Sequence, residues 1–274
     1  MQTSNYNSNK ADQDLNFVDL LVYFASKWKW FLLSIVLCTG AAWYYYANLP
    51  MVYFRSATVI IKDPSNKTST TGLDRFDNII NKVNVANEIL QFRSKNLMRK
   101  VVQRIHADVS YKVEDGFRQN ELYTQSPVLL NFLDVLPQQS LALTVTPRDE
   151  KTVVLSEFSG NIAAEPFTVQ LNDTVSLNNE MRVVVTSTNY YGNSWIGTPI
   201  RVSKLPLESV ANYYKGSLGI KQEGEESSIL QLSLKDSSPV RAEDFLNTLI
   251  NVYNEEAIKD KNMVAVNTAN FINE

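Results

Sequence analysis

The stretch SSILQLSLKDSSPVRAEDFLNTLINVYNEEAIKDKN, residues 227–262, predicts a strand that leads directly into a long helix. Its first ten residues have the composition of a strand. Ser238 is a residue type that caps helix N-termini, and Pro239 suits the first helical position. No glycine or proline occurs from Val240 to Glu274, so we expect one helix of about 50 Å at ~1.5 Å per residue.

Apolar side chains form two adjacent stripes along this helix. The stripes contain Phe245, Leu249 and Val252, and Leu246, Ile250, Tyr253 and Ala257. Two uses remain open: packing against the chain's own sheet, or contact with a neighbouring copy. In the second case we expect the oligomer face to consist of Phe245, Leu249, Val252 and Tyr253. The final residues, NTANFINE, carry no cap, and we therefore expect the sequence to stop within the helix.

Segments before this stretch predict the remaining elements. VYFRSATVIIKD, at 52–63, is rich in β-branched and aromatic residues and predicts a strand, followed by a polar loop at 64–72. Residues 78–107 have helical periodicity, with a break near Arg93 and Ser94 as a cap for a second helix that ends near His106.

Strands dominate the middle of the sequence. Between about 110 and 204, short strand-like runs separated by Gly, Asn, Asp and Pro predict an antiparallel β module. A short helix from Leu205 and the strand GSLGIKQEG follow it. The predicted fold class is α+β: an α/β base with an inserted antiparallel β module and a long C-terminal helix.

The run FLLSIVLCTGAAWYYYANLP, Phe31 to Pro50, predicts a transmembrane helix at 30–50. No charged residue occurs from Trp30 to Phe54, and about 20 apolar residues are enough to cross a ~30 Å hydrocarbon core. A signal peptide would have a shorter apolar core and small residues at its end, whereas Trp43 and Tyr44 stand there. The tail at 1–29 either continues this helix or forms an amphipathic helix on the inner membrane surface over 14–30.

Aromatic residues gather at both ends of the run. Such rings favour the headgroup level of a membrane, where their polar tips reach water. The predicted membrane-interface residues are Trp28, Trp30, Trp43, Tyr44, Tyr45 and Tyr46.

Composition and motifs argue against several function classes. The formal net charge of -3 leaves no basic surface that favours nucleic acid. Cys38 and His106 are the only cysteine and histidine, so zinc sites and His-dependent triads lack residues. No phosphate-binding P-loop, G-x-S-x-G or H-E-x-x-H motif occurs. We therefore expect no catalytic residue, cofactor or metal, as in an adaptor, receptor or scaffold.

Several segments together resemble one family. They are the strand at 52–63, NEILQFRSKNLMRKVVQRI at 87–105 and, most specifically, Ile229 to Glu274. The last of these has a strand ending in Asp, a proline at the helix start and a long charged helix. In these features the chain resembles the chain-length determinant (Wzz-type) domain of polysaccharide co-polymerases. The β module resembles the longer branch, in which a second span and a cytoplasmic tyrosine autokinase follow.

The resemblance implies a bacterial inner-membrane protein with a cytoplasmic N-terminus and a periplasmic domain at 51–274. It further implies a ring of copies that sets the length and export of a surface polysaccharide, with the polymerase, the outer-membrane exporter, the growing polysaccharide and the lipid bilayer as partners. The kinase would lie outside this sequence, so no enzyme activity is expected of this chain. A membrane-anchored extracytoplasmic sensor and a secretion adaptor remain the alternatives.

Overall fold

The computed structural model of the 274-residue chain describes residues 22–23, 26–61, 85–116, 118–159, 165–177, 181–224 and 227–273. The chain divides into two units, Met1–Leu49 and Pro50–Glu274. The predicted polar loop at 64–72 and most of the predicted amphipathic helix at 14–30 lie outside the described residues.

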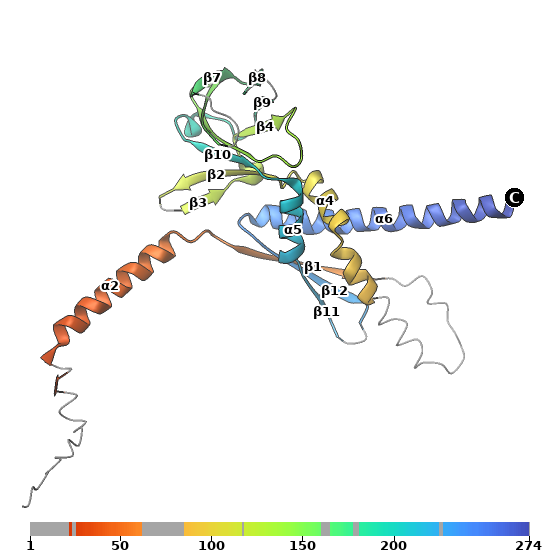
Figure 1. The fold of residues 1–274 in the computed structure, drawn as a ribbon, viewed down its shortest axis with the longest axis horizontal. Coiled ribbons are helices and arrows are strands. Elements are labelled where there is room, and N and C mark those ends of the chain that lie inside the picture. Colours follow the sequence, from red (N-terminus) through yellow and green to blue (C-terminus); the bar gives the residue numbers. More distant parts are fainter. Residues whose placement is uncertain are drawn as a thin grey trace, which may run out of the picture. The chain divides into compact units, whose positions relative to one another are not determined.

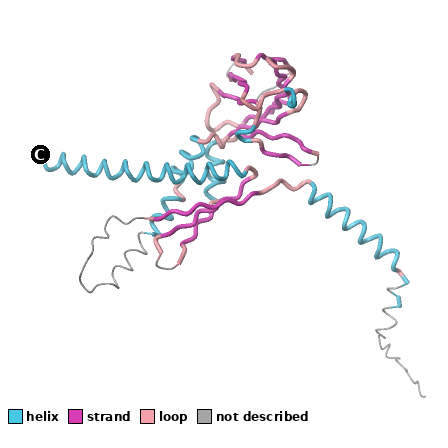
Figure 2. The backbone as a smooth tube through the Cα atoms, turned by 180° about the vertical axis from the view of Figure 1, so that it is seen from behind, coloured by secondary structure: helices cyan, strands magenta, loops and turns pink. Residues whose placement is uncertain are grey.

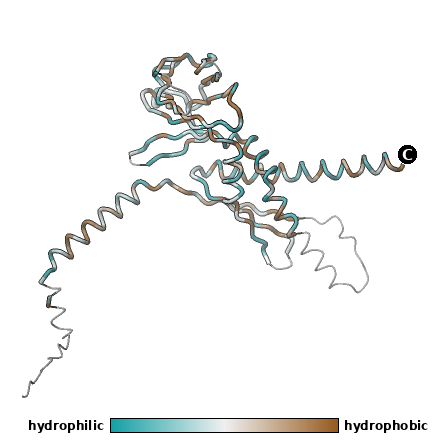
Figure 3. The backbone as a smooth tube through the Cα atoms, in the orientation of Figure 1, coloured by the Kyte–Doolittle hydropathy of each residue, from teal (hydrophilic) through white to brown (hydrophobic). Residues whose placement is uncertain are grey.

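The first unit contains helix α2, Trp28–Ala47. None of its residues is buried, and its colouring in Figure 3 is largely apolar. The Asn48 side-chain amide donates to the Tyr44 carbonyl at 2.7 Å and closes the helix before Pro50, whose missing N–H cannot continue it. By length and composition α2 is able to cross a membrane, a criterion that a signal sequence near the N-terminus also meets.

The second unit begins with an α/β base (Figures 1 and 2). Its antiparallel sheet has the order β1-β12-β11. The strands are β1 (Tyr53–Ile60), β11 (Gly219–Gln222) and β12 (Ile229–Asp236). The helices of the base are 85–92, α4 (Lys95–Arg104), α5 (Leu207–Ser217) and the first part of α6 (Pro239–Asn273).

One face of this sheet builds the core of the base. Alternate residues of a strand point to the same face, and in β12 these are the buried Leu230, Leu232 and Leu234. They pack with buried side chains from all four helices, including Phe92 and Phe245. The intervening positions of β12 are polar or only partly buried, as expected for an antiparallel sheet with one face on the core.

A β insert lies between α4 and α5. Its larger sheet has the order β3-β2-β10-β5-β6-β7 and its smaller sheet the order β4-β9-β8. The first sheet is formed by β2 (Val109–Asp115), β3 (Arg118–Glu121), β5 (Leu141–Pro147), β6 (Thr152–Ser159), β7 (Phe167–Gln170) and β10 (Ile200–Lys204). The second is formed by β4 (Val128–Phe132), β8 (Thr174–Ser176) and β9 (Arg182–Ser187), and the short helices η1 (Tyr123–Gln125) and η2 (Asn193–Trp195) lie in the connections.

The insert has its own hydrophobic core. Val128 and Val185 of the smaller sheet and Leu143, Leu155 and Val202 of the larger one belong to a single buried cluster. The two sheets therefore pack face to face, with buried side chains alternating with more exposed ones along the strands. The sequence predicted an antiparallel module over about 110–204, and these strands run from Val109 to Lys204.

The two ends of the insert are joined to each other. Its first strand, β2, pairs with its last, β10, so that Val109 lies opposite Lys204. Just outside this pair the Leu205 N–H donates to the Asp108 carbonyl at 2.8 Å, and the Lys204 ammonium pairs with the Asp108 carboxylate. Because the first and last strands of the insert lie side by side, the chain returns from the insert close to the point where it left the base.

The predicted helix caps are present. The Ser94 hydroxyl accepts from the Leu97 N–H at 3.3 Å, and the Ser238 hydroxyl accepts from the Arg241 N–H at 3.3 Å. These bonds satisfy N–H groups that have no partner within the helix.

The structure corrects the prediction of an oligomer face on α6. All four of its side chains are buried in the core of the base: Phe245, Leu249, Val252 and Tyr253. The alternative left open by the sequence, packing against the chain's own sheet, is therefore the one adopted. The sheet and helix 85–92 cover both stripes, and Tyr253 stacks on Phe92 with ring centroids 4.2 Å apart.

Candidate functional site

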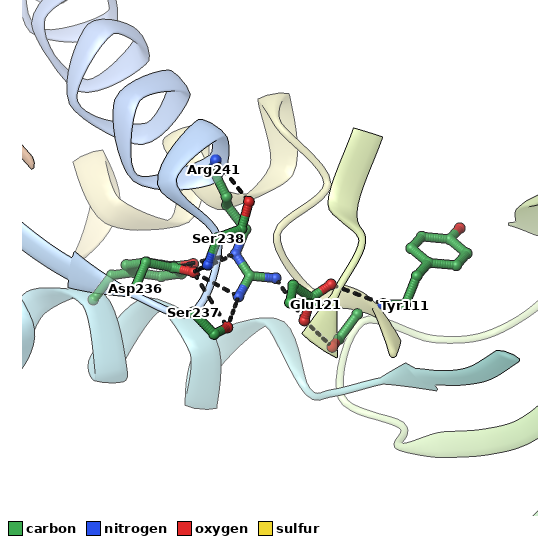
Figure 4. Close-up of polar contacts among 8 residues, drawn as sticks. Tyr111, Glu121, Asp236, Ser237, Ser238 and Arg241 are labelled. Atoms are coloured by element: carbon green, nitrogen blue, oxygen red, sulfur yellow. Dashed lines mark hydrogen bonds and ion pairs between the residues drawn. The ribbon is translucent and has the colours of Figure 1, made fainter. Parts of the chain in front are cut away.

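A buried ionic cluster joins the base to the insert, and we call it the junction (Figure 4). At its centre Arg241, in the first turn of α6, contacts Asp236 of the base and Glu121 of the insert. The guanidinium Nη2 lies 2.8 Å from Asp236 Oδ1, and Nη1 lies 3.2 Å from Glu121 Oε2. One side chain thus bridges two carboxylates from separately packed parts of the chain.

The base positions Asp236 through its neighbours. Asp236 is the last residue of β12, where the alternation of the strand turns it inward with Leu234. One carboxylate oxygen accepts from the Ser238 N–H at 2.8 Å, and the other accepts from the Tyr214 hydroxyl at 2.8 Å. The turn from strand to helix therefore fixes both the carboxylate and the arginine that binds it.

The insert positions Glu121 in the same way. Glu121 is the last residue of β3 and accepts from the Tyr111 N–H at 2.9 Å. It also accepts from the Ser110 hydroxyl. Both donors lie on β2, so the ladder between β2 and β3 aims this carboxylate at Arg241.

The junction is almost dry. The side chains of Arg241, Asp236 and Glu121 are 9%, 2% and 1% exposed. Burial of charge is costly unless every charged atom is paired. Here the neutral donors supply hydrogen bonds to the two carboxylates in addition to those from the single guanidinium. Burial, together with the Asp236 carboxylate, raises the pKa of Tyr214 well above its usual value, so that its hydroxyl stays protonated as a donor.

Tyr123 of η1 completes the junction on the insert side. The Arg241 guanidinium carbon lies 5.9 Å from the centre of its ring, within the range of a cation–π contact. The pKa of Tyr123 is raised by burial and by Asp244 of α6, whose carboxylate receives its hydrogen bond. A second polar contact therefore runs from the insert to the same helix.

The geometry of the junction favours a mechanical role. Its carboxylates are already bound by Arg241 and neutral donors, and their burial leaves no room for a substrate. Among the described residues no group of three or more His, Cys, Asp or Glu side chains is placed to hold a metal ion. Asp149, which stands next to Glu150 in the sequence, caps its own turn by accepting from the N–H groups of Lys151 and Thr152, each at 2.8 Å.

The second half of α6 leaves the core. From Ile258 to Ile272 every side chain that the structure describes is exposed, including Met263, Val264 and Phe271. Figures 1 and 2 show this part of the helix extending away from the sheet. No charged residue occurs between Asn262 and Asn273, which is unusual for a helix surrounded by water.

The predicted membrane-interface residues lie at both ends of α2. Trp28 and Trp30 are in its first turn, Trp43, Tyr44, Tyr45 and Tyr46 are near its end, and all six are exposed. Their role at a membrane interface stays a prediction.

Sequence reasoning noticed Asp236 at the end of its strand but did not identify Arg241 or Glu121. A buried pair leaves little trace in a sequence when its members are far apart. The one local signal was an arginine three residues after a capping serine, where its side chain can turn back toward the strand end.

No protein-family model matches this chain, and no curated protein is significantly similar to it.

Proposed function

We propose that this protein is a non-enzymatic, ring-forming scaffold of the bacterial inner membrane that regulates the chain length and export of a surface polysaccharide. The observation that carries the proposal is the exposed second half of α6, which has no charged residue between Asn262 and Asn273 and follows a tightly packed first half.

The exposed half of α6 supports assembly with further copies. Phe271 is 80% exposed and Val264 65%, and contiguous exposed apolar surface is typical of interaction sites. If α6 of each copy packs against α6 of the next copy, the same contact repeats around a ring. In a closed ring every copy has both of its contact surfaces covered. Helix α2 would hold each copy at the bilayer with residues 51–274 in the periplasm.

The junction supports a scaffold in particular. A scaffold must hold its parts in a fixed arrangement. Arg241 holds the insert against α6, the helix that carries the proposed contact surface. The insert would therefore present the same face in every copy of the ring. The polysaccharide itself is proposed from the resemblance of Ile229 to Glu274 to chain-length determinants.

A complementation experiment tests the proposal. A strain that lacks the gene is expected to make polysaccharide with a shorter or broader length distribution on a gel, and the unmodified gene should restore it. The double variant Val264→Ser, Phe271→Ser should fail to restore it, because both exposed side chains lie on the proposed contact surface.

The matched control is Leu136→Ser, which changes an exposed apolar residue of the insert (58% exposed) and should restore the distribution. An unchanged polymer in the deletion strain would refute the proposed function. An unchanged polymer together with an altered transcriptional or secretion phenotype would favour the sensor or the adaptor.

A further inference from the structure

A pocket of about 220 Å³ lies beside the junction, where the end of α4 meets the insert. Its floor is apolar and buried and includes Val109, Tyr111 and Leu130. Its mouth is formed by exposed polar side chains, namely His106, Thr124 and Asn131. The volume is below the ~300 Å³ at which pockets for drug-sized ligands begin, so a single ring of a ligand fits.

The floor carries an unused hydrogen-bond donor. The Tyr111 oxygen accepts from the Leu130 N–H at 3.0 Å, which leaves its own hydrogen free to donate. Among the described residues it meets no acceptor, although Tyr111 is only 5% exposed. Burial raises the pKa of Tyr111 to about 12, so this hydrogen is retained at physiological pH.

The strand edge supplies an acceptor beside that donor. Among the strands that the structure describes, β4 pairs with β9 alone. The bond from Leu130 to Tyr111 places the Leu130 N–H on the side away from β9. In an antiparallel strand the carbonyl of a residue points to the same side as its N–H. The Leu130 carbonyl therefore also faces away from β9, along the wall that lines the pocket.

His106 occupies an unusual backbone position at the mouth. The Ala107 N–H donates to the Val102 carbonyl at 3.0 Å and the His106 N–H to the Gln103 carbonyl at 3.4 Å, the bond pattern that ends a helix with a left-handed residue. His106 is that residue, with φ of 51°, where glycine is the most favourable choice. A side chain kept at a strained position next to a pocket points to a role for it.

We infer that this pocket binds one neutral pyranose residue of a polysaccharide. A pyranose has a face of C–H groups that packs on an apolar floor and a rim of hydroxyls that both donate and accept. The Tyr111 hydroxyl, Asn131, Thr124 and His106 are the complementary groups. None of the described residues that line the pocket is Asp, Glu, Lys or Arg, so a charged sugar would find no counter-charge. The inference rests on the proposed function, because it names the polymer unit that the scaffold would contact.

The single histidine provides a probe of the site. With the chain in lipid nanodiscs, the Cε1–H group of His106 gives a single NMR signal, because the sequence contains one histidine. We would titrate the chain with neutral oligosaccharides of glucose, mannose, galactose and N-acetylglucosamine, and with a glucuronate disaccharide for comparison. At least one neutral sugar is expected to shift the signal saturably, and the glucuronate is not.

Two variants test the contacts through saturation transfer to the sugar protons, which needs no histidine. Asn131→Ala and His106→Gly should each raise the dissociation constant about tenfold, as expected when a sugar hydroxyl loses one neutral hydrogen-bond partner. The matched control is Asn172→Gly, which changes another exposed left-handed residue, with φ of 68°, outside the pocket and should bind normally.

The inference is overturned if no neutral sugar shifts the His106 signal at its solubility limit, or if both variants bind as the unmodified chain does. A glucuronate that binds as well as the neutral sugars would also overturn it. None of these results would refute the proposed function, because that function is tested by the polymer of the deletion strain. A normal polymer in that strain would refute the proposed scaffold but would leave the measured sugar binding unaffected.

Discussion

Replacement of Arg241 by methionine should separate the insert from the base. Methionine has a similar unbranched stem but no charge, so Asp236 and Glu121 would stay buried without their cation. Removal of one member of a buried ion pair typically costs about 3–5 kcal/mol. We expect a loss of this size in the free energy of unfolding, because the two carboxylates are 2% and 1% exposed and cannot reach water without movement.

The lost contacts justify that magnitude. The Arg241 Nε lies 3.1 Å from both oxygens of Asp236, and Nη2 also contacts the Ser237 hydroxyl at 3.1 Å. Hydrogen bonds to charged groups contribute about 1.5–3 kcal/mol each, although those of one fork are not additive. Arg241→Lys keeps the charge but loses the bidentate geometry, and we expect a smaller loss of about 1–2 kcal/mol.

Hydrogen–deuterium exchange of the full chain in detergent measures the effect by region. In Arg241→Met the amides of β2 and β3 should exchange faster, as should those in the first turns of α6. The matched control is Arg104→Met. Arg104 is 49% exposed and pairs with Glu255 at 2.7 Å on the surface, where solvent screens an ion pair and leaves it little effect on stability.

A change in Arg241→Met no larger than that in Arg104→Met would refute the argument that the junction holds the insert. Faster exchange spread evenly over the whole unit would also contradict it, because the lost contacts lie between the base and the insert.

Three further outcomes follow from particular residues. Burial raises the pKa of Tyr111 from 10.0 to about 12, so between these pH values Tyr111 holds a proton in the folded state that it has lost in the unfolded state. In urea unfolding Tyr111 should therefore contribute a fall in stability of about 1.4 kcal/mol per pH unit, beside the contributions of Tyr123 and Tyr214, whose pKa values burial also raises. Tyr111→Phe should reduce the slope by that amount. Phe271→Ser should change the free energy of unfolding by less than about 0.5 kcal/mol but should lower the mass of the detergent-solubilised assembly in sedimentation. Phe245→Ala should lower the free energy of unfolding by about 3–5 kcal/mol. Equal losses of stability in the two variants would contradict the division of α6 into a buried and an exposed half. His106→Gly should raise the melting temperature in a thermal unfolding scan, because it removes a left-handed strain of about 1 kcal/mol, and a clear drop would show that the imidazole is needed for folding.

Elements whose signals are local were predictable from the sequence. Ser238 and Pro239 act within one helical turn, and the structure starts α6 at Pro239. The same holds for Ser94 and α4. An apolar run also identifies itself by composition, and α2 spans Trp28–Ala47 against the predicted 30–50.

The pocket was not predictable. His106 was expected at the end of its helix, where it lies, but its left-handed conformation follows from how the chain turns into β2. In the sequence Tyr111 alternates with its neighbours like any strand residue. Only the fold brings β4 against it, so that its oxygen accepts from the Leu130 N–H and its own hydrogen remains available to donate.

The sequence by itself determined the strand, cap and helix of residues 229–273 and the strand-rich character of the insert, because caps, turns and periodicity act between residues a few positions apart. The tertiary structure alone decided what covers the apolar stripes of α6 and which carboxylates Arg241 meets. Those outcomes depend on the pairing of β2 with β10 and of β1 with β12, which brings distant residues together. The oligomer face expected from periodicity failed for this reason: an apolar stripe shows that a surface will be covered, and only the fold shows what covers it.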